Sequence, residues 1–264
     1  MTAIVPLLLQ NAIIVALCFA VLWLIALRIR DVSFVDSWWA LGMVVLAWTS
    51  FLGTGAPSPR KLLVLALCSV WGLRLGIYLL WRWRRNGPDR RYQTMLGKAE
   101  SQRGMSFGRA ALQLVFALQA PLQFVVALPV QLGQLGGADV GPLGYAGALL
   151  AATGILFETV GDWQLARFKN DPTNRERVLD TGLWRFTRHP NYFGDCCVWW
   201  GLYLIAAQSG VGLWSLPGPV LLTFLLTRWS GMPTIEDRLR RKKPGYEEYV
   251  RRTPAFVPWL PKQG

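Results

Sequence analysis

The sequence predicts an all-α, polytopic membrane protein with about seven transmembrane helices. The chain has 264 residues, of which 53% are hydrophobic and only 16% are charged, whereas soluble domains carry about 25% charged residues. Its 14 Trp residues suit the two interfaces of a bilayer. We therefore expect a single membrane-embedded domain over residues 1–264.

Each expected span is an apolar run close to the roughly 20 residues that cross a hydrocarbon core as a helix. The first run is too long for a secretory signal peptide and lacks its positive start and cleavage site, so we expect it to be retained. The last two runs are short and close together, which predicts a helical hairpin. The spans are 6–28, 36–54, 61–81, 110–131, 142–165, 194–210 and 213–230, and a tail follows over 231–264.

The charged residues predict the orientation of the chain. Residues 82–109, 166–193 and 228–264 contain 23 of the 28 Lys and Arg residues, and seven spans place all three stretches on one side. The positive-inside rule makes that side cytoplasmic and the N-terminus external. The net charge of +13 is then a topology signal, so we expect no nucleic-acid partner. The four cysteines lack metal-ligand spacing, and we expect no metal site.

Five ionisable residues lie within the expected spans, where a charge is costly and marks a functional candidate. Glu158 and Asp162 share a helix face at a spacing of four, as do Arg74 and Tyr78. Pairing or snorkelling explains any one of these charges, whereas five at one depth indicate a polar cavity that opens to the cytoplasm. The five are Asp36, Arg74, Glu158, Asp162 and Asp195.

The loop before the sixth span carries the single histidine of the chain. Pro190 suits the first turn of a helix, and a helix N-terminus favours anions and phosphates. The chain has no GxGxxG and no Walker loop, so a nucleotide has to be held by side chains between helices. The residues expected around this helix start are Arg188, His189, Asn191 and Tyr192.

Residues 188–195, Arg-His-Pro-Asn-Tyr-Phe-Gly-Asp, resemble the C-terminal signature of membrane-embedded sterol and steroid reductases. A related Arg-His-Pro signature occurs in isoprenylcysteine carboxyl methyltransferases. Through residues 31–39, 71–74 and 236–258, the chain is also similar to bacterial steroid-5α-reductase-like proteins. The resemblance implies a seven-helix fold in the bacterial inner membrane with NADPH in a cytoplasm-facing cavity. It implies nucleotide contacts by Arg74, Arg85, Asp162, Lys169, Arg177, Asn191, Asp195, Glu236, Tyr246 and Tyr249.

The resemblance also bears on the catalytic residues. Steroid reductases polarise the substrate carbonyl with a Glu on the second helix and a Tyr on the third; here the Tyr position falls on Trp71, and the Glu has no clear match. We predict that Asp36, held protonated by burial, is the proton donor and that Tyr78 assists it. The expected reaction is NADPH-dependent reduction of a conjugated C=C bond in a lipophilic steroid-, sterol- or isoprenoid-like enone drawn from membrane lipid.

Two other functions stay open at this point. The shared Arg-His-Pro segment permits an S-adenosylmethionine-dependent methyltransferase, although that cofactor offers no phosphate to the many basic residues. A non-enzymatic lipid-binding or transport protein is the third possibility. Against it, the chain has no inverted repeat and no paired broken helices of the transporter kind.

Overall fold

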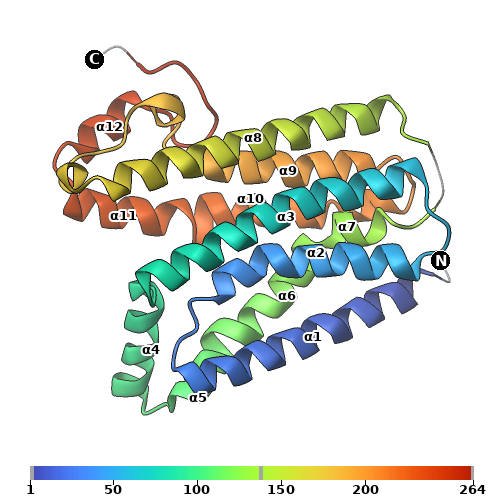
Figure 1. Cartoon of the computed structure of the whole chain (residues 1–264), viewed down its shortest axis with the longest axis horizontal. Helices are drawn as coiled ribbons and strands as arrows, with labels where there is room; N and C mark the ends of the chain where they lie inside the picture. The colour runs from blue at the N-terminus through green and yellow to red at the C-terminus, as the bar shows by residue number, and fades with distance from the viewer. Residues whose placement is uncertain (1–2, 137–138, 263–264) are drawn as a thin grey trace.

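A computed structural model describes residues 3–136 and 139–262, and every regular element within those ranges is helical (Figure 1). Helices α4, α11 and α12 gather at one end of a bundle of long helices, at the left of Figure 1. The elements are α1 Ile4–Ile29, α2 Val35–Gly53, α3 Pro59–Asn86, α4 Arg90–Arg103, α5 Phe107–Ala111, η1 Leu112–Phe116, α6 Ala117–Val126, α7 Leu128–Leu132, α8 Pro142–Asn170, η2 Pro172–Asn174, η3 Gly182–Arg185, α9 Pro190–Ala206, η4 Gly212–Ser215, α10 Pro217–Phe224, η5 Leu225–Trp229, α11 Met232–Lys242 and α12 Tyr246–Arg252.

Within the described residues, five helical segments are long and apolar enough to cross a membrane, which fits an integral membrane protein. They are Ile4–Ile29, Val35–Gly53, Pro59–Asn86, Phe107–Val126 and Pro142–Asn170. The regions expected as the sixth and seventh spans form shorter helices, because α9 has 17 residues and α10 has eight before it continues into the π-helical turn η5. Seven spans and the orientation of the termini stay predictions.

The basic stretch after the third span is more helical than expected. Helix α3 extends to Asn86, beyond the expected end at residue 81, and helix α4 follows after a short turn. Gly87 ends α3 with a φ of 73°, a conformation that favours glycine. Asp89 then caps α4 by accepting a hydrogen bond from the Arg91 amide at 2.8 Å. A helix dominated by charged and polar residues has no apolar run, so hydropathy did not reveal α4.

The expected span over 110–131 is a broken helix. The α-helical pattern gives way to a π-helical turn at η1 and ends at Ala127, and α7 restarts at Leu128. Pro129 has no N–H to continue the ladder, which explains the second break. Gln131 compensates by donating a side-chain hydrogen bond to the Phe124 carbonyl at 2.8 Å.

Glycines let helices α8 and α9 approach closely along their length. On α8 they stand seven residues apart at Gly147, Gly154 and Gly161, and on α9 they stand at Gly194 and Gly201. A Cβ atom placed on Gly154 would lie 2.5 Å from the Gly194 carbonyl oxygen. Small residues at such crossings allow backbone contact between membrane helices. This contact fixes the acidic residues of α8 against the start of α9.

Candidate functional site

Arg74 of α3 joins two acidic residues of α8 deep in the bundle. Its Nη1 lies 2.8 Å from Asp162 Oδ2, and its Nη2 lies 2.6 Å from Glu158 Oε2. The spacing of four residues places both carboxylates on the face of α8 that meets α3. Trp71, one turn before Arg74, donates from Nε1 to Glu158 Oε2 at 2.8 Å. The convergence expected for three of the intramembrane charges is therefore present.

Helix α9 completes this polar cluster, defined here as Arg74, Glu158, Asp162, Asn191 and Asp195. Asn191 donates from Nδ2 to Asp162 Oδ1 at 3.3 Å. The Asp195 carboxylate is close enough to Glu158 and Asp162 for their negative charges to repel one another. The cluster thus combines three acids with one guanidinium. Among the residues that the structure describes, three buried atoms of the cluster have no hydrogen-bond partner: Arg74 Nε, Arg74 Nη2, which only forms the ion pair with Glu158, and Asp195 Oδ1. Buried polar atoms without a partner in the protein are satisfied by a ligand or by water.

Asp36 belongs to a separate group at the start of α2. Its carboxylate accepts a hydrogen bond from the Tyr92 hydroxyl at 2.7 Å and pairs with Arg91 at 2.8 Å. The role of Asp36 as a proton donor stays a prediction, and in this structure its carboxylate is engaged by Arg91 and Tyr92. Sequence reasoning missed Tyr92, since only the folding of α4 against α2 brings the phenol to Asp36.

Tyr92 keeps its own proton in this group. Burial raises the pKa of Tyr92 above its usual value of 10, and the negative charge of Asp36 raises it further. Gln119 of α6 donates to the Tyr92 oxygen at 3.3 Å and accepts from Trp39 Nε1 at 2.7 Å. The phenol is thus held in a defined position as a proton-carrying group.

Tyr78 was expected to lie beside Asp36, but it lies closer to the polar cluster. It stands on the same face of α3 as Arg74, its ring stacks with Trp81, and the Arg82 guanidinium lies 6.0 Å from its centroid. No hydrogen bond joins it to Asp36 in the described part of the chain. Its phenol instead experiences the charges of Asp162 and Arg74, which places Tyr78 with the polar cluster.

Tyr192 lies between the two groups. It is half-buried on the first turn of α9, where the charges of Arg91, Asp36, Arg82 and Asp195 all act on it. Its amide donates to Asn191 Oδ1 at 3.1 Å. The five intramembrane charges therefore form two neighbouring groups, one around Arg74 and one around Asp36.

Arg188 and His189 face the C-terminal segment instead of an open anion site. Arg188 donates from Nε and Nη2 to the Glu236 carboxylate, at 2.9 and 3.2 Å, and from Nη1 to the Val250 and Thr253 carbonyls. His189 Nε2 lies 2.9 Å from Glu236 Oε1. We call these five residues the C-terminal latch. Because protein atoms already occupy the donors of Arg188, a role in positioning the segment fits better than the predicted phosphate contact.

Two further predicted residues strengthen the same attachment. The Tyr249 hydroxyl donates to the Trp184 carbonyl at 2.5 Å, and the ring of Tyr246 packs against that of Tyr249 with centroids 5.8 Å apart. Both rings are buried. They fix α12 to the loop before α9, on which Arg188 stands.

The remaining predicted residues lie near the ends of the helices. Arg85 is exposed and stacks over Trp81 at 5.4 Å, and exposed Arg177 donates to Asn174 Oδ1 at 3.3 Å. Neither contacts the polar cluster. Lys169, at the end of α8, experiences the attraction of Asp162 and the repulsion of nearby cations.

Acid is expected to weaken the C-terminal latch. Burial would raise the pKa of Glu236, but hydrogen bonds from His189 and Arg188 lower it from 4.5 to about 2. Burial lowers the pKa of His189 below 6.5, against the opposing effect of Glu236. The unfolded chain therefore binds more protons, so the stability from His189 is lost as pH falls below 6.5 and that from Glu236 as pH falls from 4.5 toward 2.

Thermal unfolding in detergent as a function of pH checks this expectation. The Glu236→Gln variant should start from a lower melting temperature at pH near 7 and lose less on acidification than the wild type. Glu176→Gln, which changes an exposed glutamate, should keep the wild-type profile. Equal acid sensitivity in the wild type and Glu236→Gln would show that Glu236 does not control the latch.

Comparison with known proteins assigns the chain to a family. No curated protein and no solved structure matches the chain. One family model matches residues 22–253, which include every residue of the polar cluster, and its description is a protein of unknown function (DUF1295). Because the match covers most of the sequence, the chain belongs to the DUF1295 family.

Proposed function

We propose that this protein is a membrane-embedded NADPH-dependent reductase of a conjugated C=C bond in a lipophilic enone. The observation that carries the proposal is the polar cluster, in which α3, α8 and α9 bring a guanidinium, carboxylates and an amide together at a membrane-crossing helix. The proposal includes seven spans, with the basic loops and the C-terminus in the cytoplasm of a bacterial cell.

The cluster has the donors and acceptors that a dinucleotide requires. Arg74 Nε is free to donate, Asp195 Oδ1 is free to accept, and Asn191 offers both functions. Ribose hydroxyls and a carboxamide present matching groups. These residues of the chain would bind and orient NADPH, and the bound cofactor would supply the hydride.

Basic residues near the end of α8 support a phosphate-bearing cofactor. The Lys169 ammonium lies among the charges of Arg82, Arg238 and Lys243, with Asp162 as the carboxylate that offsets them. This excess of positive charge suits a 2′-phosphate or a pyrophosphate. S-adenosylmethionine carries no phosphate and would leave these cations unpaired, so the reductase is favoured over a methyltransferase.

The Asp36–Tyr92 pair is our candidate for the proton donor. The Tyr92 hydroxyl holds its proton 2.7 Å from Asp36, and Gln119 keeps the oxygen in place. A substrate carbonyl that replaced Asp36 as acceptor would receive this hydrogen bond. Tyr92 thus takes over the role that the sequence assigned to Asp36 and Tyr78, and Asp36 orients the hydroxyl until the substrate binds.

Cofactor affinity and turnover test the two halves of the proposal separately. Calorimetric titration should give saturable NADPH binding that Asn191→Ala weakens about fivefold to tenfold, as expected for one lost hydrogen bond. Asn86→Ala, at the exposed end of α3, is the matched control and should bind like the wild type. Tyr92→Phe should bind NADPH normally but reduce enone-dependent NADPH oxidation about a hundredfold or more. Unchanged affinity in Asn191→Ala would overturn the cofactor site, and full turnover in Tyr92→Phe would overturn the proton donor.

A further inference from the structure

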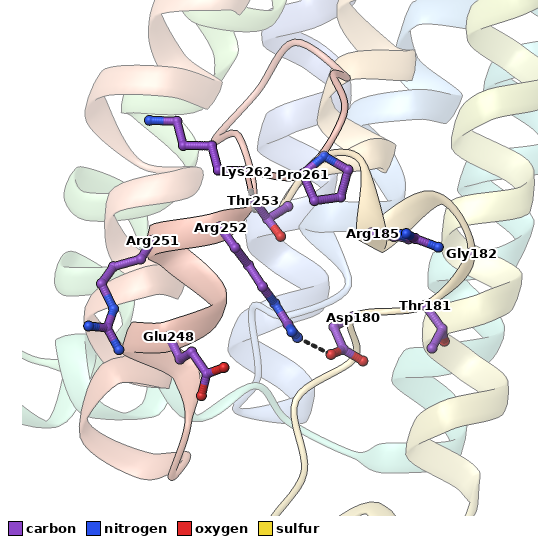
Figure 2. Close-up of a pocket in the computed structure, with 10 residues that line it drawn as sticks. All are labelled: Asp180, Thr181, Gly182, Arg185, Glu248, Arg251, Arg252, Thr253, Pro261 and Lys262. Carbon is purple, nitrogen blue, oxygen red and sulfur yellow. Dashed lines mark hydrogen bonds and ion pairs between the residues drawn. The ribbon is translucent and has the colours of Figure 1, made fainter. Parts of the chain in front are cut away.

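A pocket of about 920 Å³ lies between the loop before α9 and the C-terminal segment (Figure 2). This volume is in the range of small-molecule sites, and the residues around it are not those of the polar cluster. The walls come from η3, α12 and the residues that follow α12. The lining residues are Asp180, Thr181, Gly182, Arg185, Glu248, Arg251, Arg252, Thr253, Pro261 and Lys262.

The lining carries an excess of positive charge. Four of the residues are Arg or Lys and two are acidic. Figure 2 shows Arg252 reaching across the pocket to Asp180, with which it forms an ion pair. Arg185, Arg251 and Lys262 are then balanced only by Glu248 within this lining. An anion is therefore the ligand that the pocket favours.

Two contacts place the pocket level with the part of α8 that suits a membrane interface. The Leu183 amide donates to Gln164 Oε1 at 3.0 Å, and Trp184 Nε1 donates to the Gly161 carbonyl at 3.1 Å. The neighbouring Trp163 is 57% exposed and lies under the Arg167 guanidinium at 5.6 Å. An exposed Trp beside an Arg, near the end of a membrane-crossing helix, is typical of the interface between lipid and water.

The C-terminal segment presents apolar side chains next to the pocket. Val257, Trp259 and Leu260 are 61%, 73% and 69% exposed, although the backbone around them is fixed. The Trp259 amide donates to the Phe186 carbonyl at 3.0 Å, and the Lys262 amide donates to the Arg252 carbonyl at 2.9 Å. Large apolar side chains held outward beside basic residues suit insertion among lipid headgroups.

We propose that this pocket binds the phosphate headgroup of an anionic phospholipid, while Val257, Trp259 and Leu260 insert among the neighbouring acyl chains. Arg185, Arg251 and Lys262 line the pocket with their side chains directed away from one another (Figure 2), and they would turn inward to receive the phosphate, while the ion pair between Arg252 and Asp180 holds the two walls together. The site lies where lipid and water meet, so a headgroup reaches it without leaving its leaflet. The proposal requires a membrane-embedded chain and does not depend on the proposed reductase activity.

Native mass spectrometry of protein extracted from nanodiscs tests this site. The discs contain equal amounts of phosphatidylglycerol and phosphatidylcholine. The wild type should retain phosphatidylglycerol preferentially, and a variant with Arg185→Gln, Arg251→Gln and Lys262→Gln should lose about tenfold or more of that preference. A control with Lys98→Gln, Arg103→Gln and Arg175→Gln removes as many exposed cations elsewhere and should retain the lipid. Equal retention by the two triple variants would overturn the proposal.

Two further measurements separate the lipid from other anions and from a folding defect. Inorganic phosphate should stabilise the detergent-solubilised wild type much less than added phosphatidylglycerol does, and equal stabilisation would show a free-phosphate site. A lower melting temperature of the pocket variant than of the control in pure phosphatidylcholine would reveal a folding defect. In that case, the salt dependence of lipid retention by the wild type replaces the comparison of variants. The lipid preference of the wild type should then fall as salt is raised, and a preference that ignores salt would contradict the charged pocket.

Discussion

Replacing Arg74 by methionine is expected to cost about 3–5 kcal/mol of folding free energy, because it leaves a buried group of acids without its cation. Arg74 lies within 2.8 Å of carboxylate oxygens of both Glu158 and Asp162, and its side chain is only 21% exposed. Methionine matches the length of the arginine stem but neutralises neither acid. Repulsion between these two carboxylates of α8 and Asp195 of α9 then favours separation of the two helices, unless protons bind to the acids.

The expected consequences of Arg74→Met are a lower melting temperature and loss of NADPH binding. Arg85→Met is the matched control, since Arg85 stands on the same helix but is exposed and outside the cluster. The double variant Arg74→Met with Glu158→Gln should recover part of the stability, because one unpaired charge is removed as well. A wild-type melting temperature in Arg74→Met would show that the ion pairs do not stabilise the bundle.

Substituting leucine for Gly154 is expected to separate helices α8 and α9, at a cost of about 3 kcal/mol or more. A Cβ atom there would lie 2.5 Å from the Gly194 carbonyl oxygen and 2.7 Å from the Val198 amide nitrogen. Both are backbone atoms, so no side-chain rotation relieves the contact. The displacement would also move Asn191 and Asp195 away from the carboxylates of α8.

Graded substitutions distinguish this close contact from a general effect on α8. Gly154→Ala should destabilise less than Gly154→Leu, because alanine adds only the Cβ atom and favours the helix by about 1 kcal/mol. Thr153→Leu places the same side chain on the exposed neighbouring position and should leave the melting temperature close to the wild type. Equal melting temperatures for Gly154→Leu and Thr153→Leu would contradict the packing described here.

The sequence predicted the parts of this fold that depend on local pattern. Hydropathy placed α1, α2 and the start of α8 to within two residues, and the spacing of Glu158 and Asp162 anticipated their shared face. The depth of Arg74 pointed to the same cluster. Such features follow from the period of a helix and the cost of burying charge, so they can be derived without tertiary contacts.

The contacts that the sequence did not reveal join distant segments of the chain. Arg188 and His189 stand at a helix start, yet their donors meet Glu236, which is more than 45 residues away in the chain. The partners of Asp36, Arg91 and Tyr92, lie on α4, a polar helix that hydropathy did not reveal. A hydropathy profile predicts which segments lie in the membrane, but it does not predict which polar side chains contact one another.

A structure of the purified protein with NADPH tests the central claim most directly. We expect density for the dinucleotide in contact with Arg74, Asn191 and Asp195, with its phosphates toward Lys169. Tyr92 should remain free of the cofactor, available to the substrate. Absence of dinucleotide density at a saturating NADPH concentration, or density confined to a surface away from α3, α8 and α9, would contradict the proposed reductase.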